Sequence, residues 1–196
     1  MLILKSPAQA EFTVKKSRFL SEVTPVDSPA AARALWQERK RLYDNGGHIV
    51  YAFITGSGGE QMGCSDDGEP SGTAGRPVLA VLKGAGVTNV VLTVARWFGG
   101  VKLGTGGLVH AYSEAAQRVL AEAVLTEFTT MRSVAFTVPY FLYEAVRQEL
   151  GKVQFEPSRE DFGEVVTVAG VLPEVRFPTL RAALRDLSNG RIELDG

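Results

Sequence analysis

The chain has 196 residues, of which 45% are hydrophobic and 22% charged, a composition typical of one large or two small globular domains. Its 21 basic and 22 acidic side chains give a net charge of -1, which excludes a protein that holds nucleic acid by an overall positive field, so any RNA binding must be local. A single cysteine, Cys64, and two histidines exclude a clustered structural zinc site.

The N-terminal segment has only three apolar residues between Met1 and Lys5, too few for the core of a signal peptide. No apolar run in the chain approaches the ~18 residues of a membrane span. We therefore expect a soluble, cytoplasmic protein with no membrane partner. Residues 10–26 follow as two short runs in which apolar and polar side chains alternate, which predicts a β-hairpin.

A helix is predicted after this hairpin, over residues 28–47. Ser28 suits the N-cap and Pro29 the first helical position, while Asn45-Gly46-Gly47 ends the pattern.

Two strongly apolar segments, residues 48–55 and 89–97, are long enough to form strands buried on both faces. Between them we expect a long loop over residues 56–77 and a short buried helix over residues 78–86. From Thr105, a candidate cap, apolar residues repeat at i, i+4, i+7 and i+8, which predicts an amphipathic helix of about four to five turns.

Five glycines separate the second of these strands from the long helix: Gly99, Gly100, Gly104, Gly106 and Gly107. A strand that runs through such a turn into a helix brings free N–H groups and the positive end of the helix dipole together, and the missing side chains let an anion approach them. Arg96 and Lys102 add two cations. The same glycines also fit tight turns and close packing of a helix on a sheet.

A second glycine-rich stretch, "EPSGTAGRP", opens the short helix, with the hydroxyls of Ser71 and Thr73 and the guanidinium of Arg76 close by. Neither stretch is a Walker A loop or the dinucleotide-binding glycine fingerprint. The two helix starts together predict an anion-binding cleft with no familiar phosphate motif.

The acidic run Asp66, Asp67 and Glu69 has two interpretations. It could hold a magnesium ion beside a phosphate or act in acid/base chemistry. It could equally cap helix starts and pair with Arg76 and Arg96. His48 fits a partly buried histidine with a hydrogen-bond partner. No serine or cysteine nucleophile with a base emerges, so we predict no catalytic residues and no metal ligands.

Residues 131–196 form a second predicted domain, separate from residues 1–130. The pattern indicates strands at 132–140, 153–158, 163–173 and 191–196 and helices at 141–152 and 174–190. This order, βαββαβ, is the ferredoxin-like arrangement. Because the segment carries 8 basic and 10 acidic side chains, RNA binding by bulk attraction is not expected, and a protein contact or docking role is favoured.

Two long motifs, "SDDGEPSGTAGRPVL" (65–79) and "ARWFGGVKLGTGGLVHAY" (95–112), resemble the two signatures of the IMPACT family in order and spacing. The resemblance covers roughly residues 15–125. Two positions depart from the family pattern, since Trp97 stands where a tyrosine is usual and His110 where an arginine is usual. The positions that match it are His48, Asp66, Asp67, Glu69, Arg76, Arg96 and Lys102.

This resemblance implies an α+β fold, with an N-terminal domain like the second domain of ribosomal protein S5 and a small ferredoxin-like C-terminal domain. It also implies a non-enzymatic translation-related regulator, since eukaryotic members regulate translation, with RNA, the ribosome or a translation factor as partner and no cofactor. The alternative is a nucleotide-binding phosphotransferase, because GHMP kinases share the implied fold; Mg²⁺ would then lie on the acidic run. Fold alone does not decide between them.

Overall fold

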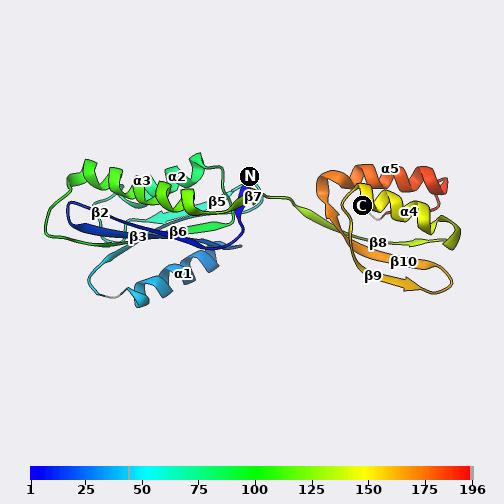
Figure 1. Ribbon diagram of the computed structural model, residues 1–196, viewed down its shortest axis with the longest axis horizontal. Coiled ribbons are helices and arrows are strands. Elements are labelled where there is room, and N and C mark those ends of the chain that lie inside the picture. The colour runs from blue at the N-terminus through cyan, green and yellow to red at the C-terminus, as the bar shows by residue number, and fades with distance from the viewer. Residues whose placement is uncertain (44, 195–196) are drawn as a thin grey trace. The chain divides into compact units, whose positions relative to one another are not determined.

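The computed structural model describes residues 1–43 and 45–194. It divides into two compact units, Met1–Phe128 and Thr129–Gly196, so the boundary lies two residues before the expected one (Figure 1). Both units combine helices with antiparallel sheets, which confirms the α+β class. The likeness of the first unit to ribosomal protein S5 stays a prediction.

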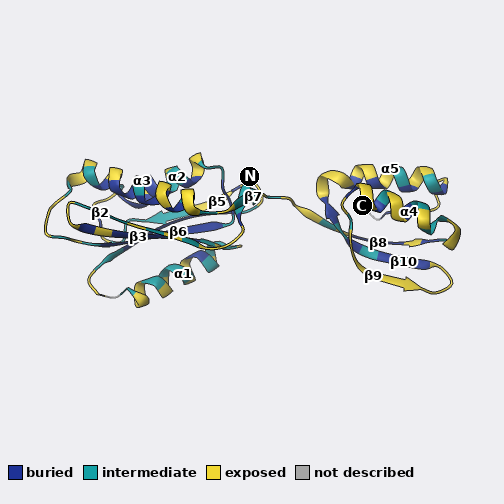
Figure 2. Cartoon of the chain, viewed as in Figure 1, coloured by how far each residue is buried: buried dark blue, intermediate teal, exposed yellow. Residues whose placement is uncertain are grey.

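The first unit is built on a five-stranded antiparallel sheet in the order β2-β3-β6-β4-β5. The two strands predicted from continuous apolar sequence lie in its interior and are almost fully buried, as Figure 2 shows for β6. The strands are β2 Ala8–Val14, β3 Ser17–Pro25, β4 His48–Thr55, β5 Gln61–Ser65 and β6 Val90–Trp97.

Three strands of this unit were not predicted. The edge strand β5 lies inside the expected loop, where turn-forming residues and a partly exposed surface hide its periodicity. Its Gly63 faces Phe53, and a Cβ there would lie 2.7 Å from that ring. The other two, β1 Leu2–Leu4 and β7 Leu125–Glu127, pair with each other and are too short to show a period.

Helices cover both faces of the sheet, α1 on one side and α2 and α3 on the other (Figure 1). Helix α1, Pro29–Leu42, has the predicted cap, since the N–H of Ala31 donates to Ser28 Oγ at 3.3 Å. Helix α2, Gly75–Gly84, begins three residues earlier than expected. Helix α3, Gly104–Glu122, is not capped by Thr105 as predicted, because Leu103 occupies the N-cap position and no side chain caps it.

The second unit is a three-stranded antiparallel sheet in the order β8-β10-β9, with both of its helices on one face (Figure 1). Its core is formed by the inward positions of β8 and β10 and the apolar side of the helices. The elements are β8 Met131–Val138, α4 Tyr140–Lys152, β9 Glu156–Phe162, β10 Val166–Pro173, a 3-10 turn at Glu174–Arg176 and α5 Phe177–Ser188.

The strand expected at the C-terminal end is wrong for residues 191–194, which adopt no regular structure, while residues 195–196 lie outside the described residues. The described order is therefore βαββα rather than βαββαβ. The chain leaves α5 through left-handed Asn189 and Gly190, and the N–H of Ile192 then donates to Ser188 Oγ at 2.9 Å. Ile192 and Leu194 are buried in the core of the unit by this route.

Across residues 1–43 and 45–194, no helix has the length and apolarity that a membrane crossing requires.

Candidate functional site

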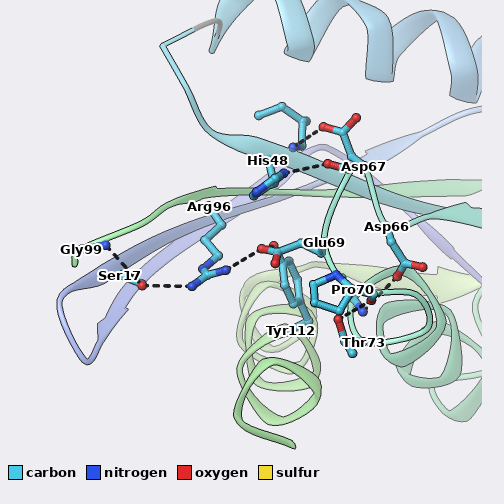
Figure 3. Close-up of polar contacts among 12 residues, drawn as sticks. Ser17, His48, Asp66, Asp67, Glu69, Pro70, Thr73, Arg96, Gly99 and Tyr112 are labelled. Atoms are coloured by element: carbon cyan, nitrogen blue, oxygen red, sulfur yellow. Dashed lines mark hydrogen bonds and ion pairs between the residues drawn. The ribbon is translucent and has the colours of Figure 1, made fainter. Parts of the chain in front are cut away.

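The first of the two glycine-rich helix starts, that of α2, is filled by the protein's own carboxylate. Asp66 Oδ1 accepts hydrogen bonds from the N–H groups of Ala74 at 3.0 Å and Gly75 at 2.8 Å, and its Oδ2 accepts from Gly72 at 2.8 Å. The hydroxyl of Thr73 donates to the Pro70 carbonyl at 2.6 Å (Figure 3). These donors are satisfied internally, so Asp66 takes the place that an anion would occupy.

Replacing Asp66 with Asn is expected to destabilise the first unit by about 1–2 kcal/mol at pH 7, the effect of a lost helix cap. Burial would raise the pKa of Asp66, but the N–H groups at the α2 start and the charge of Arg76 lower it below its ordinary value. A lowered folded-state pKa means that this stabilisation is present above about pH 3.9 and is lost as the pH falls below that value. Urea unfolding at pH 7 and pH 3 measures the difference, which a merely exposed carboxylate would not produce.

The third member of the acidic run, Glu69, belongs to a buried ion pair (Figure 3). Arg96 Nη1 lies 2.7 Å from Glu69 Oε1, and the hydroxyl of Tyr112 donates to the same oxygen at 2.8 Å. The side chains of Arg96 and Glu69 are only 7% and 3% exposed. Arg96, expected as an anion anchor, is therefore neutralised inside the unit. Burial, together with the charge of Glu69, raises the pKa of Tyr112 well above its usual range, which keeps the phenol protonated as a donor.

Asp67 and His48 form a third set of internal contacts, at the start of β4. Asp67 Oδ2 accepts from the N–H of Ile49 at 2.7 Å, and its Oδ1 pairs with Lys40 Nζ at 2.5 Å. His48 is half-buried, and its Nδ1 donates to the Asp67 carbonyl at 2.7 Å. The three carboxylates thus serve three separate structural contacts.

Magnesium binding by the acidic run gains no support from this arrangement. Within the described residues, no group of three His, Cys, Asp or Glu side chains is placed to hold a metal ion. The phosphotransferase alternative required such ligands beside a bound phosphate.

The start of α3 is open, in contrast to that of α2. No side chain caps it, and a Cβ added at Gly104 or Gly106 would meet nothing within 4 Å. Lys102 is exposed just before it, and the Phe98 side chain is 57% exposed in the preceding loop. Of the two predicted anion sites, the α3 start is the one whose backbone N–H groups receive no side-chain cap from the part of the chain that the structure describes.

Gly99 is a glycine because another part of the backbone passes against it. A Cβ at Gly99 would lie 1.8 Å from the carbonyl oxygen of Lys16. Lys15 and Lys16, both at positive φ, form the two-residue turn between β2 and β3. This turn brings both exposed lysines to the glycine loop. Neither lysine was predicted as part of the site, although two residues between alternating runs are the usual signal of such a turn.

Trp97 fixes the same end of the sheet. The centroid of its ring lies 4.6 Å from the guanidinium carbon of Arg18. The ring also packs edge-on against Tyr43, with ring centroids 5.8 Å apart. Its indole N–H donates to Asn45 Oδ1. The loop that follows is therefore held by the β2–β3 turn and by the segment after α1. We call Lys15, Lys16, Phe98, Lys102 and the α3 start, Gly104–Gly107, the basic end.

The remaining predicted residues lie at the α2 start, in the glycine turn or at the α3 start. Arg76 and Ser71 are exposed beside the α2 start, whose donors Asp66 occupies. Gly100, with φ of 88°, adopts a conformation that favours glycine. Thr105 is exposed at the α3 start, where it provides no cap.

The comparison with known proteins gives one consistent result over nearly the whole chain. The Impact N-terminal domain model matches residues 15–120. The chain is 32% identical to the IMPACT family member YigZ of Escherichia coli (strain K12), over 98% of this chain and 96% of that protein. It is 36% identical to an IMPACT family member in the pol 5' region of Thermus thermophilus, over 93% and 99% of the two chains.

The structural comparison agrees, since a crystal structure of a hypothetical protein superposes with a TM-score of 0.69 at 32% identity, covering 98% of this chain and 95% of that one. The human protein IMPACT is 30% identical over 56% of this chain, which corresponds to 35% of the human protein. Because the domain model spans more than half of the chain and the bacterial relatives match along its whole length, the chain belongs to the IMPACT family.

Proposed function

We propose that this protein is a non-enzymatic, translation-related regulator that binds single-stranded RNA at the basic end. The translation-related part rests on family membership, through the eukaryotic members to which the resemblance assigns that role. Their similarity covers 55–58% of this chain, as in the Schizosaccharomyces pombe and mouse proteins.

The observation that carries the RNA-binding part is the uncapped start of α3 beside an exposed aromatic ring and unpaired lysines. Helix N–H groups and the dipole attract a phosphate. Lys15, Lys16 and Lys102 are exposed, and none has an ion-pair partner among residues 1–43 and 45–194. Their charge is thus available to neutralise phosphates, although the whole chain carries a net charge of -1.

The exposed Phe98 ring favours binding of single-stranded RNA over binding of an RNA duplex. The ring is more than half exposed at the edge of the glycine loop, and an unstacked base can lie on such a ring. In a duplex the bases are already stacked, so the ring would contribute little. Gly100, Gly104 and Gly106, whose missing side chains face open space, leave room for the sugar-phosphate chain to approach the α3 start.

Replacing both Lys16 and Lys102 with Ala is expected to weaken binding of a fluorescently labelled single-stranded RNA and to flatten its salt dependence by about 1.4 in the slope of log K against log salt. The Phe98→Ala variant is expected to lose about 5- to 150-fold in affinity, the effect of one lost stacking contact. Fluorescence anisotropy over a salt series measures both.

The matched control replaces Lys5 and Lys83, two exposed lysines elsewhere on the first unit, with Ala. This variant has the same change in net charge and should bind like the wild type. Equal losses in both double variants would show attraction by net charge alone, and unchanged binding in the Lys16/Lys102 variant would rule out the basic end.

A further inference from the structure

The second unit separates its charges along the chain. Residues 129–175 carry four basic and seven acidic side chains, whereas residues 176–193 carry four arginines against Asp186 and Glu193. Although the unit as a whole has a net negative charge, it therefore contains a basic segment, residues 176–193, which consists of α5 and the residues that flank it.

The ion pairs formed by these basic residues also differ between the two segments. Each basic residue of the first segment has an ion-pair partner: Arg132 with Glu174, Arg147 with Glu144, Lys152 with Glu149 and Arg159 with Asp161. In the basic segment, Arg176, Arg181, Arg185 and Arg191 are all exposed, and within residues 129–194 none of them forms an ion pair. We call these four the arginine row.

A groove of about 970 Å³ lies beside two members of this row, between α5 and the chain that follows it. Arg181 and Arg185 line it from α5, while Gly190 and Glu193 line it from the returning segment. The apolar residues of its floor, Phe177, Ile192 and Leu194, are each at most 6% exposed. The groove therefore offers charge but no deep apolar pocket.

We propose that the arginine row is a second nucleic-acid contact, which binds the sugar-phosphate backbone of RNA. The guanidinium group presents a planar fork of donors that fits two phosphate oxygens, and all four cations of the row are arginines. Arg181 and Arg185 are one helical turn apart on the same face, about 6 Å along the axis, so both can contact one strand.

A protein partner fits the groove less well. Protein interfaces depend on a few buried aromatic or aliphatic anchors, and the apolar floor of this groove is already covered. Contacts to a phosphate backbone need no such anchor and no particular base. The proposal concerns the second unit alone and does not depend on the basic end.

The test is binding of a labelled oligouridylate by the full-length chain, because uridine stacks weakly and reports mainly backbone contacts. Replacing Arg181 and Arg185 with Ala should flatten the salt dependence by about 1.4 in slope. The matched control replaces Arg147 and Lys152 of α4, which are exposed but paired, with Ala and should keep the wild-type slope. The Arg181→Lys, Arg185→Lys variant keeps both charges and should keep the slope, while binding more weakly.

Three results would overturn the proposal: an unchanged slope in the Arg181/Arg185 variant, an equal loss in the Arg147/Lys152 control, or competition by oligoglutamate as strong as by unlabelled oligouridylate. The lysine variants of the basic end are measured separately. A loss of binding seen only in the lysine variants would support the basic end and refute the arginine row. A loss seen only in the Arg181/Arg185 variant would support the arginine row and refute the basic end.

Discussion

Replacing Glu69 with Ala is expected to destabilise the first unit by about 3–5 kcal/mol, because it leaves the buried guanidinium of Arg96 without a counter-charge. The hydroxyl of Tyr112 loses its acceptor in the same change. Urea unfolding followed by tryptophan fluorescence measures the effect in this unit, since Trp36 and Trp97 are the only tryptophans of the chain and both belong to it.

Two variants show whether burial is the cause. Glu114→Ala removes a partly exposed partner of Arg118 on α3 and should cost only about 0.3–0.5 kcal/mol. Replacing Glu69 and Arg96 together with Met should recover much of the loss, because no unpaired charge then remains in the interior. A Glu69→Ala protein as stable as the Glu114→Ala protein would contradict the buried pair.

Replacing Gly99 with Ala is the second change for which we expect a large effect, about 1–3 kcal/mol or more of lost stability. The added methyl group would overlap the Lys16 carbonyl, which is backbone and cannot rotate away as a side chain can. Since Lys15 and Lys16 already adopt positive φ, the β2–β3 turn has little freedom to adjust. The same unfolding experiment measures this change.

Gly106→Ala is the comparison for Gly99→Ala, because we expect it to leave stability intact and to weaken binding. It adds a methyl group to open space within α3, where alanine favours the helix, so stability should stay equal or rise by about 0.5–1 kcal/mol. RNA binding should fall instead, because the methyl group narrows the approach to the α3 start. Equal losses of stability in the two variants would show that both glycines serve packing.

Much of the fold could be predicted because its signals are local. The Ser28-Pro29 start of α1 and the apolar runs of β4 and β6 each depend on neighbouring residues. The strand β5 could not be predicted in this way, since its few residues form a strand only by pairing with β4. Likewise, the apolar residues Ile192 and Leu194 led to the prediction of a strand, but their side chains fill the core from a segment that is not a strand.

The candidate site could be predicted in its residue types but not in its pairings. The sequence allowed Asp66 and Glu69 to be either ligands or structural partners, and only the tertiary fold places Glu69 beside Arg96, 27 residues away. The role of Gly99 depends on Lys16, which is still more distant in sequence. The local pattern of glycines predicts a turn. It does not predict which distant segment of backbone packs against that turn.

The position of β6 in the sheet has a consequence for how the protein is made. The β2–β3 and β4–β5 hairpins are joined only through β6, which is the last of the five strands to leave the ribosome. Isolated two-stranded hairpins are at best marginally stable, so a nascent chain shorter than about 97 residues cannot complete this sheet. Until then the edges of β3 and β4 that pair with β6 have no partner strand, and chaperones that bind unfinished apolar segments have their main opportunity during this interval of synthesis.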